Sequence, residues 1–180
     1  MKQLAAFTIP FVGLKQGEHL FEFEIDDKFF QHFEYEEFNA VRVQGTAKML
    51  KKSNGLEFEF NIQGSVNVQC DLTNEPYDQH ITGIHHLVVN FGEAYNDEDD
   101  SLLVLPQQAY EVNIQQYFYE LIILSVPIKR VHPGVLDGTL HSDILDKLKE
   151  LSPQLPDEDQ AKESTDPRWD QLKKLLTDKQ

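Results

Sequence analysis

The sequence has a single cysteine, Cys70, and no apolar run near the roughly 20 residues that a membrane helix requires. One cysteine excludes an internal disulfide, so the fold must be held by other interactions. The glycine-rich nucleotide-binding patterns, the G-x-S-x-G elbow and the H-E-x-x-H zinc motif are also absent. These absences argue against a membrane-spanning protein and leave the common enzyme classes unsupported.

Basic residues are scarce as well: 31 Asp and Glu residues stand against 16 Lys and Arg residues, a formal net charge of −15. This balance argues against nucleic-acid binding, because phosphate contacts require lysine and arginine. The acids are concentrated in residues 18–37, 92–101 and 152–166, and 13 acids and 14 bases remain outside these segments. We therefore expect a nearly neutral body with acidic blocks, which either are solvated loops or attract a basic partner.

Strict alternation of side chains marks the middle of the chain. The even positions of residues 56–70 are apolar or glycine and the odd positions are polar, which predicts a long strand with one buried face, bent at Gly64. Residues 41–49 alternate in the same way. Asn54-Gly55 lies between the two segments, and this pair is the strongest short hairpin signal because both residues tolerate positive φ. The two strands should therefore pair antiparallel.

Weaker patterns extend this picture on both sides of the hairpin. Alternation predicts strands at residues 19–25 and 77–91, with a short helical turn capped by Asp26 or Asp27 after the first. After an acidic loop at 92–101, helical spacing predicts a helix over 114–125 that stops before Pro127, and another that begins near Ser142.

Together these patterns predict an α+β fold. Its sheet is curved and antiparallel, open or closed into a barrel, and the 114–125 helix covers it. We expect one α+β domain at 1–151, an acidic flexible linker at 152–165 and an amphipathic C-terminal helix at 166–180. The start of the chain is expected to be a strand and loop rather than a signal peptide, since Pro10 interrupts its apolar run.

The last predicted helix carries the features of a docking motif. Asp166 is a good N-cap, Pro167 suits the first helical position, and the apolar residues that follow share one face. A helix this short must dock on something, either its own domain or a partner, and both alternatives remain open. For a partner, Trp and Arg are favoured anchors. The candidate partner-binding residues are Pro167, Arg168, Trp169, Leu172, Lys173 and Lys174.

Cys70 raises the question of a metal site or a reactive thiol. It falls on the apolar face of its strand, so burial in the core is the expectation. A metal site needs about four ligands, and the available set is Cys70, His80, His85 and His86. Alternation places His85 and His86 on opposite faces of one strand, which makes joint binding of one ion difficult.

The order of these features resembles the YceD family, described as large ribosomal RNA subunit accumulation proteins and as a domain of unknown function. The resemblance runs over nearly the whole chain, and its specificity comes from the order and spacing of several segments. They read IPFVGLKQGEHLFEFEID, FNIQGSVNVQCDLTNEPYDQHI, VVNFGE, YFYELIILSVPIKRVHP and DPRWDQLKKLL.

The resemblance implies a non-enzymatic, cytoplasmic factor of bacteria or organelles that supports accumulation of large-subunit (23S) ribosomal RNA. The implied partner is a ribosomal protein, a large-subunit assembly intermediate or precursor rRNA, with no cofactor and no membrane. Members commonly carry a Cys-x-x-Cys pair at the strand end. Here Cys70 occupies the first position and Thr73 the second, which argues against a metal-bound pair in this protein.

The distribution of basic and acidic residues suggests two alternative mechanisms for such a factor. In the first, clustered bases contact precursor RNA. In the second, which we favour, the acidic blocks hold a basic ribosomal protein or assembly factor and the effect on RNA is indirect. A metal-binding protein or an enzyme that uses Cys70 and the nearby histidines remains the alternative. The candidate RNA contacts are Arg42, Lys48, Lys51, Lys52, Lys129 and Arg130.

Overall fold

A computed structural model describes residues 4–152 of the chain. The chain divides into two compact units, Met1–Leu140 and His141–Gln180. The first contains all the strands that the structure describes, and the second contributes one described helix. The predicted tail helix at 166–180, and the predicted linker beyond Ser152, lie outside the described residues.

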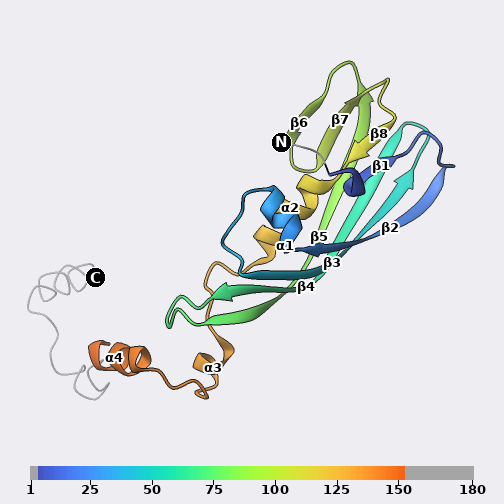
Figure 1. The fold of residues 1–180 in the computed structure, drawn as a ribbon. Coiled ribbons are helices and arrows are strands. Elements are labelled where there is room, and N and C mark those ends of the chain that lie inside the picture. Colours follow the sequence, from blue (N-terminus) through green and yellow to red (C-terminus); the bar gives the residue numbers. More distant parts are fainter. Residues whose placement is uncertain (1–3, 153–180) are drawn as a thin grey trace, which may run out of the picture. The chain divides into compact units, whose positions relative to one another are not determined.

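The first unit is built on a six-stranded, curved sheet that does not close, with β2 and β6 at its two edges (Figure 1). Neighbouring strands are antiparallel except β5 and β7, which run parallel. The predicted α+β class and the curved antiparallel sheet are confirmed, and of the two forms left open the sheet takes the open one. In spatial order the strands are β2 (Gly17–Asp26), β3 (Ala40–Lys51), β4 (Gly55–Gln69), β5 (Pro76–Gly92), β7 (Leu102–Pro106) and β6 (Asn96–Asp99).

The predicted hairpin is confirmed in detail. β3 and β4 pair without interruption from Lys51 opposite Leu56 to Ala40 opposite Asn67. The turn between them closes with a hydrogen bond of 2.9 Å from the Lys52 N–H to the Gly55 carbonyl. β4 and β5 then pair over the whole length of β4. Alternation predicted these strands because one face of each is covered.

The acidic segment 92–101 differs from its prediction. It was expected to be a loop, yet it contains the edge strand β6 (Asn96–Asp99), which pairs with β7. Every side chain of β6 is exposed. A strand that buries neither face leaves no alternation in the sequence, so a period-two search cannot find it.

Helices and a small second sheet cover the inner face of the main sheet (Figure 1). Helix α2 contacts β4 and β5, and α1 contacts β2 and β3. The predictions of a helix over 114–125 and of a capped helical turn after β2 are both confirmed, and Asp26 accepts the capping hydrogen bonds of α1. The covering elements are η1 (Ala5–Phe7), α1 (Asp27–His32), α2 (Gln115–Ser125) and the two-stranded sheet of β1 (Thr8–Pro10) with β8 (Glu111–Asn113).

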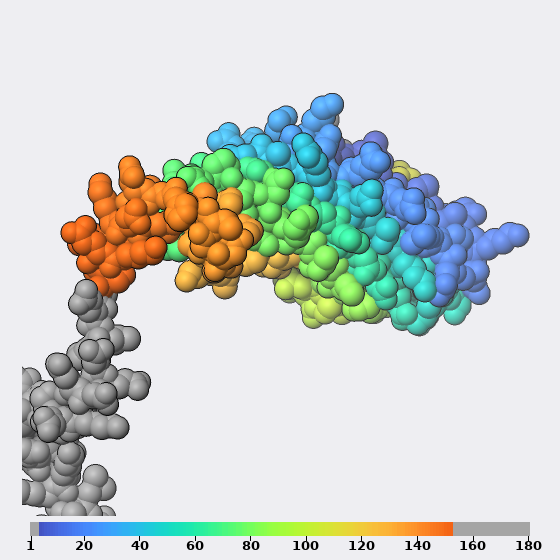
Figure 2. All heavy atoms as spheres, turned by 90° about the horizontal axis from the view of Figure 1, so that it is seen from below, coloured from blue at the N-terminus to red at the C-terminus, as the bar shows by residue number. Residues whose placement is uncertain are grey.

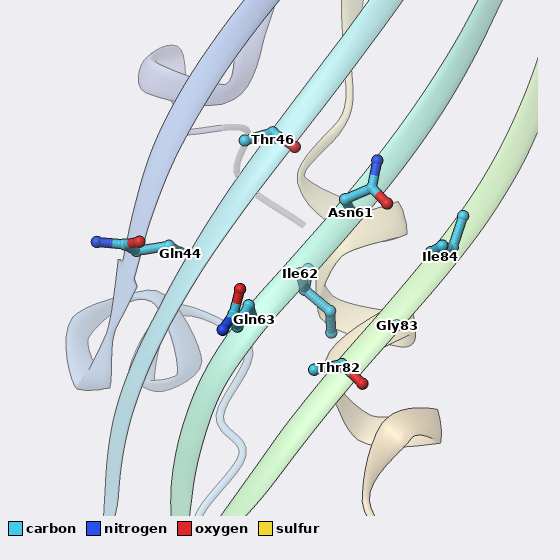
Figure 3. A pocket seen from close by; sticks show the side chains of 8 residues that line it. All are labelled: Gln44, Thr46, Asn61, Ile62, Gln63, Thr82, Gly83 and Ile84. Carbon is cyan, nitrogen blue, oxygen red and sulfur yellow. The ribbon is translucent and has the colours of Figure 1, made fainter.

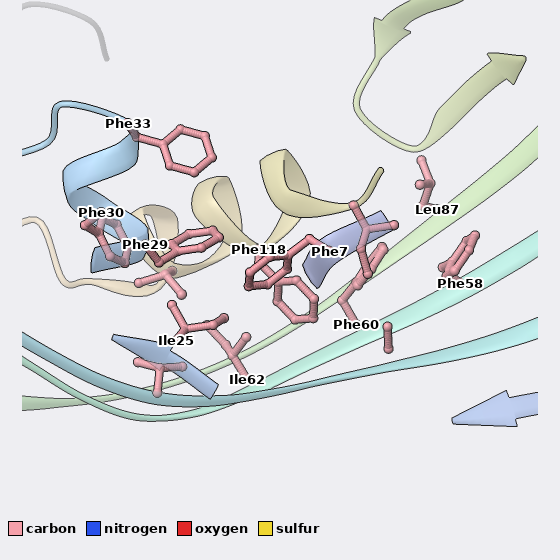
Figure 4. Packing of buried hydrophobic residues seen from close by; sticks show 14 of the residues in the cluster. Phe7, Ile25, Phe29, Phe30, Phe33, Phe58, Phe60, Ile62, Leu87 and Phe118 are labelled. Carbon is pink, nitrogen blue, oxygen red and sulfur yellow. The ribbon is translucent and has the colours of Figure 1, made fainter. Parts of the chain in front are cut away.

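Aromatic side chains fill the space between α2 and the sheet (Figure 4). Phe118 of α2 is fully buried, and its ring lies 5.2 Å from Phe23, 5.3 Å from Phe60 and 6.0 Å from Phe7. Separations of this size are favourable for aromatic pairs. Phe118 thus joins η1, β2 and β4 through one side chain.

A second aromatic group links α1 and α2 and contains a tyrosine with an altered pKa. Tyr35 lies 6.0 Å from Tyr119, and its hydroxyl donates to the Glu37 carboxylate at 3.3 Å. Burial and the negative charge of Glu37 raise the pKa of Tyr35 to about 12. The folded protein therefore keeps this proton at a pH where an unfolded tyrosine loses it.

This pKa predicts a loss of stability in alkali. Because the folded state binds the Tyr35 proton more tightly, the contribution of Tyr35 is complete below pH 10 and falls as the pH rises towards about 12. Urea unfolding at several pH values measures the effect, and ultraviolet titration follows the phenolate directly. The variant Tyr35→Phe should lose this component of the alkaline decrease, and an unchanged pH dependence in that variant would contradict the assignment.

Two short helices end the described chain. In the first unit, α3 (Pro133–Leu136) is capped by His132. In the second unit, α4 (Asp143–Leu151) begins after Ser142, whose hydroxyl accepts from the Ile144 N–H at 3.2 Å, so the predicted helix start is confirmed. No helix within residues 4–152 is both long and apolar enough to cross a membrane.

Candidate partner-binding surface

The outer face of the sheet carries a polar hollow at its centre. Gln44, Gln63 and Thr82 occupy directly opposed positions on β3, β4 and β5, and Thr46 and Asn61 form the next row (Figure 3). Together with Ile62, Gly83 and the exposed Ile84, these residues line an open hollow of about 550 Å³. The polar side chains offer amide and hydroxyl groups without formal charge, which can donate and accept hydrogen bonds.

An acidic row borders this hollow along β2. Glu18, Glu22 and Glu24 alternate with inward-facing residues, so their carboxylates share the outer face with the exposed Leu20. The Asp26 carboxylate at the end of the strand caps α1. Glu18 forms an ion pair of 2.9 Å with Lys48 on β3. Figure 2 shows the strands as adjacent bands, with the blue band of the N-terminal residues at one border.

The three hairpin lysines predicted to contact RNA all have partners within the chain. Lys48 pairs with Glu18, and Lys52 forms a close ion pair with Glu57. The Lys51 ammonium donates to the backbone carbonyls of Phe11 at 2.7 Å and Leu14 at 2.8 Å. These contacts compensate the positive charge of the hairpin locally, while exposed pairs of this kind are individually weak.

Arg130 has a structural role. Its guanidinium lies 3.5 Å from Asp71 and 3.7 Å from Glu37, and its backbone N–H donates to Asp71 at 2.7 Å. Asp71 in turn donates its N–H to the Arg130 carbonyl. These contacts fasten the segment after α2 to the turn between β4 and β5. Among the described residues, the exposed Arg42 and Lys129 are the two candidate RNA contacts with no ion pair or side-chain hydrogen bond.

Cys70 is buried at the end of β4, as its position on the apolar face predicted. Its sulfur accepts a hydrogen bond of 3.3 Å from the His132 N–H. Burial raises the pKa of the thiol, but hydrogen bonds from the Thr73 side chain and from the N–H groups of His132, Leu72 and Thr73 bring the pKa below its usual value. Thr73, at the second Cys-x-x-Cys position, is itself buried, and its side chain contributes to the lowered pKa of Cys70.

The histidines of β5 lie as alternation predicted, on opposite faces of the sheet. His85 faces Tyr117 of α2 at 6.1 Å between ring centres, whereas His86 lies opposite Glu59 on the outer face. Within residues 4–152, no three His, Cys, Asp or Glu side chains are grouped so that they could hold a metal ion. The metal-binding alternative therefore gains no support from this region.

Two features of this surface were only partly visible in the sequence. The acids of residues 18–37 formed a recognised block, but the sequence did not show that β2 is an edge strand. The polar hollow was not predicted as a site, although the odd positions of β4 had already placed Asn61 and Gln63 on the outer face. The candidate residues of the tail, Pro167 to Lys174, lie outside the described residues and stay a prediction.

The fold of residues 4–152 is that of an α+β protein with an open, mostly antiparallel sheet, whose inner face is covered and whose outer face is covered by no described segment. The chain belongs to the YceD family, because the family model described as "Large ribosomal RNA subunit accumulation protein YceD" matches residues 58–176. The match begins within β4, so β2 and β3 precede it. Comparisons with curated proteins and with solved structures found no match. The family name connects the chain with accumulation of large-subunit ribosomal RNA.

Proposed function

We propose that this protein is a non-enzymatic, cytoplasmic factor of ribosome biogenesis, which supports accumulation of large-subunit (23S) rRNA by binding a basic ribosomal protein or assembly factor. Membership of the YceD family supports the connection with large-subunit RNA. The observation that carries the choice of a protein partner is the acidic row of β2 beside an outer face that no segment of residues 4–152 covers. Such a surface attracts basic segments and repels phosphate.

The state of the basic residues favours this mechanism over direct RNA binding. Four of the six candidate RNA contacts already have carboxylates or carbonyls of the same chain as partners. Phosphate affinity grows with the number of contacts, and two unengaged bases, Arg42 and Lys129, supply few. Direct contact with precursor RNA is therefore the second candidate, to be separated by experiment.

Affinity purification of the full-length protein from its native cells at low salt tests the proposal. Half of the sample is treated with nuclease before bound proteins and RNA are identified. We expect large-subunit ribosomal proteins or assembly factors to remain after nuclease treatment, because they contact the protein directly. Salt alone is not a sufficient test, since it weakens both kinds of contact.

Two other outcomes would contradict the proposal. If large-subunit RNA is enriched and the proteins are lost with nuclease, binding occurs through RNA and Arg42 becomes the first residue to substitute. If neither is enriched, the proposed ribosomal role is wrong. Depletion of the protein provides an independent control, because it should lower the ratio of 23S to 16S rRNA.

A further inference from the structure

Strand β2 has one edge that no other segment of residues 4–152 occupies. It pairs with β3 along its whole length, and it is the first strand in the spatial order of the sheet. No backbone hydrogen bond joins its other edge to any described segment. The outward-pointing N–H and C=O groups of this edge form a template on which a further strand can pair.

β2 has only one of the devices that usually block such an edge. Protected edge strands are short, interrupted by a bulge or proline, or carry charged side chains or inward-pointing charges. On β2 the charged side chains are carboxylates on the outer face, which repel a second acidic strand and attract a basic one. β2 has ten residues, no proline and an unbroken register with β3. Its inward side chains include Phe21 and Phe23, which are only partly buried. A neighbouring strand would therefore gain both backbone hydrogen bonds and apolar contacts.

The outward-facing side chains of β2 determine which kind of strand can pair with its edge. Glu22 lies opposite Thr46 and Glu24 opposite Gln44, so neither carboxylate faces a cation on β3. A second copy of β2 would bring its own acids against this row, and directly opposed like charges are unfavourable. Lysine or arginine in the same positions would be attracted. The charge pattern thus favours a basic strand over a second copy of this chain.

We propose that an extended segment of a protein partner, in which basic and apolar residues alternate, adds to the free edge of β2 as a further strand. Its basic side chains face Glu22 and Glu24, and its apolar side chains contact Phe21 and Phe23. Main-chain hydrogen bonds then provide affinity and the alternate side chains provide specificity. This inference rests on the proposed function, which supplies a basic large-subunit partner.

A model peptide tests the mode of binding with the full-length protein. The probe is a peptide of about ten residues in which lysine alternates with valine, long enough to span β2. A second peptide of the same sequence is N-methylated at alternate amides, which keeps its charge but removes the donors of one edge. We expect the first peptide to bind and to protect the amides of β2 from hydrogen exchange, and the second to bind at least about tenfold more weakly.

Matched variants test the site. The double variant Glu22→Gln with Glu24→Gln removes two charges from β2 with little change of shape, and should weaken peptide binding about tenfold. The double variant Asp146→Asn with Glu150→Gln removes two charges from exposed positions of α4 and should change binding less than twofold. Equal binding of the two peptides, or equal effects of the two double variants, would overturn the inference.

The same variants separate this inference from the proposed function. In the purification described above, the β2 double variant should lose large-subunit proteins that the α4 double variant retains after nuclease treatment. If both variants retain them, strand addition at β2 is wrong while the proposed function stands. If the unchanged protein itself retrieves no large-subunit component, the proposed function fails first.

Discussion

Replacement of Phe118 by alanine should lower the free energy of unfolding by about 3–5 kcal/mol, the usual cost of truncating a buried phenylalanine. Phe118 has no exposed surface and contacts the rings of Phe7, Phe23 and Phe60. Its removal leaves a cavity between α2 and the sheet. The three rings belong to three different elements, so they cannot all shift to fill the empty space. Urea unfolding followed by far-ultraviolet circular dichroism measures the change.

A second substitution at the same position is the control. Phe118→Leu keeps most of the apolar volume, so its loss should be clearly smaller than that of Phe118→Ala. Gly45 permits this packing, since a Cβ atom there would lie 2.6 Å from the Phe118 ring. A loss below about 1 kcal/mol for Phe118→Ala would show that α2 does not depend on this contact.

Replacement of Gly64 by alanine should cost about 3 kcal/mol, which is large for the addition of one methyl group. A Cβ atom on Gly64 would lie 2.2 Å from the Arg42 carbonyl oxygen and 2.6 Å from the Val43 Cα atom. Both atoms belong to the backbone of β3, so relief requires separation of two paired strands rather than rotation of a side chain. Urea unfolding again provides the measurement.

Gly13 offers a matched control for this substitution. No atom lies within 4 Å of a Cβ built on Gly13, so Gly13→Ala should change the stability by less than about 0.5 kcal/mol. If Gly64→Ala and Gly13→Ala lower the free energy of unfolding by similar amounts, the close approach of β3 to Gly64 is not the cause of the loss.

The candidate partner-binding surface was harder to predict than the fold. The acidic block at 18–37 is evident in the sequence. Its composition, however, does not show whether the acids lie in a loop or on an edge strand of a sheet. The predicted RNA contacts show the same difficulty, because Lys51 and Arg130 read as free charges in the sequence. In the structure Lys51 donates to carbonyls about forty residues away, and Arg130 pairs with Asp71. Composition cannot reveal partners that are distant along the chain.

The sequence by itself determined the β3–β4 hairpin, the strand β5, the helix α2 and the burial of Cys70. Each depends on periodicity or turn chemistry within a few residues, and such patterns survive in any arrangement of the elements. Only the tertiary structure decided that the sheet stays open, that β6 forms, and that, within residues 4–152, no segment pairs with the outer edge of β2 or covers the outer face beside it. These features follow from which strands meet, and that choice depends on contacts between residues far apart in the chain.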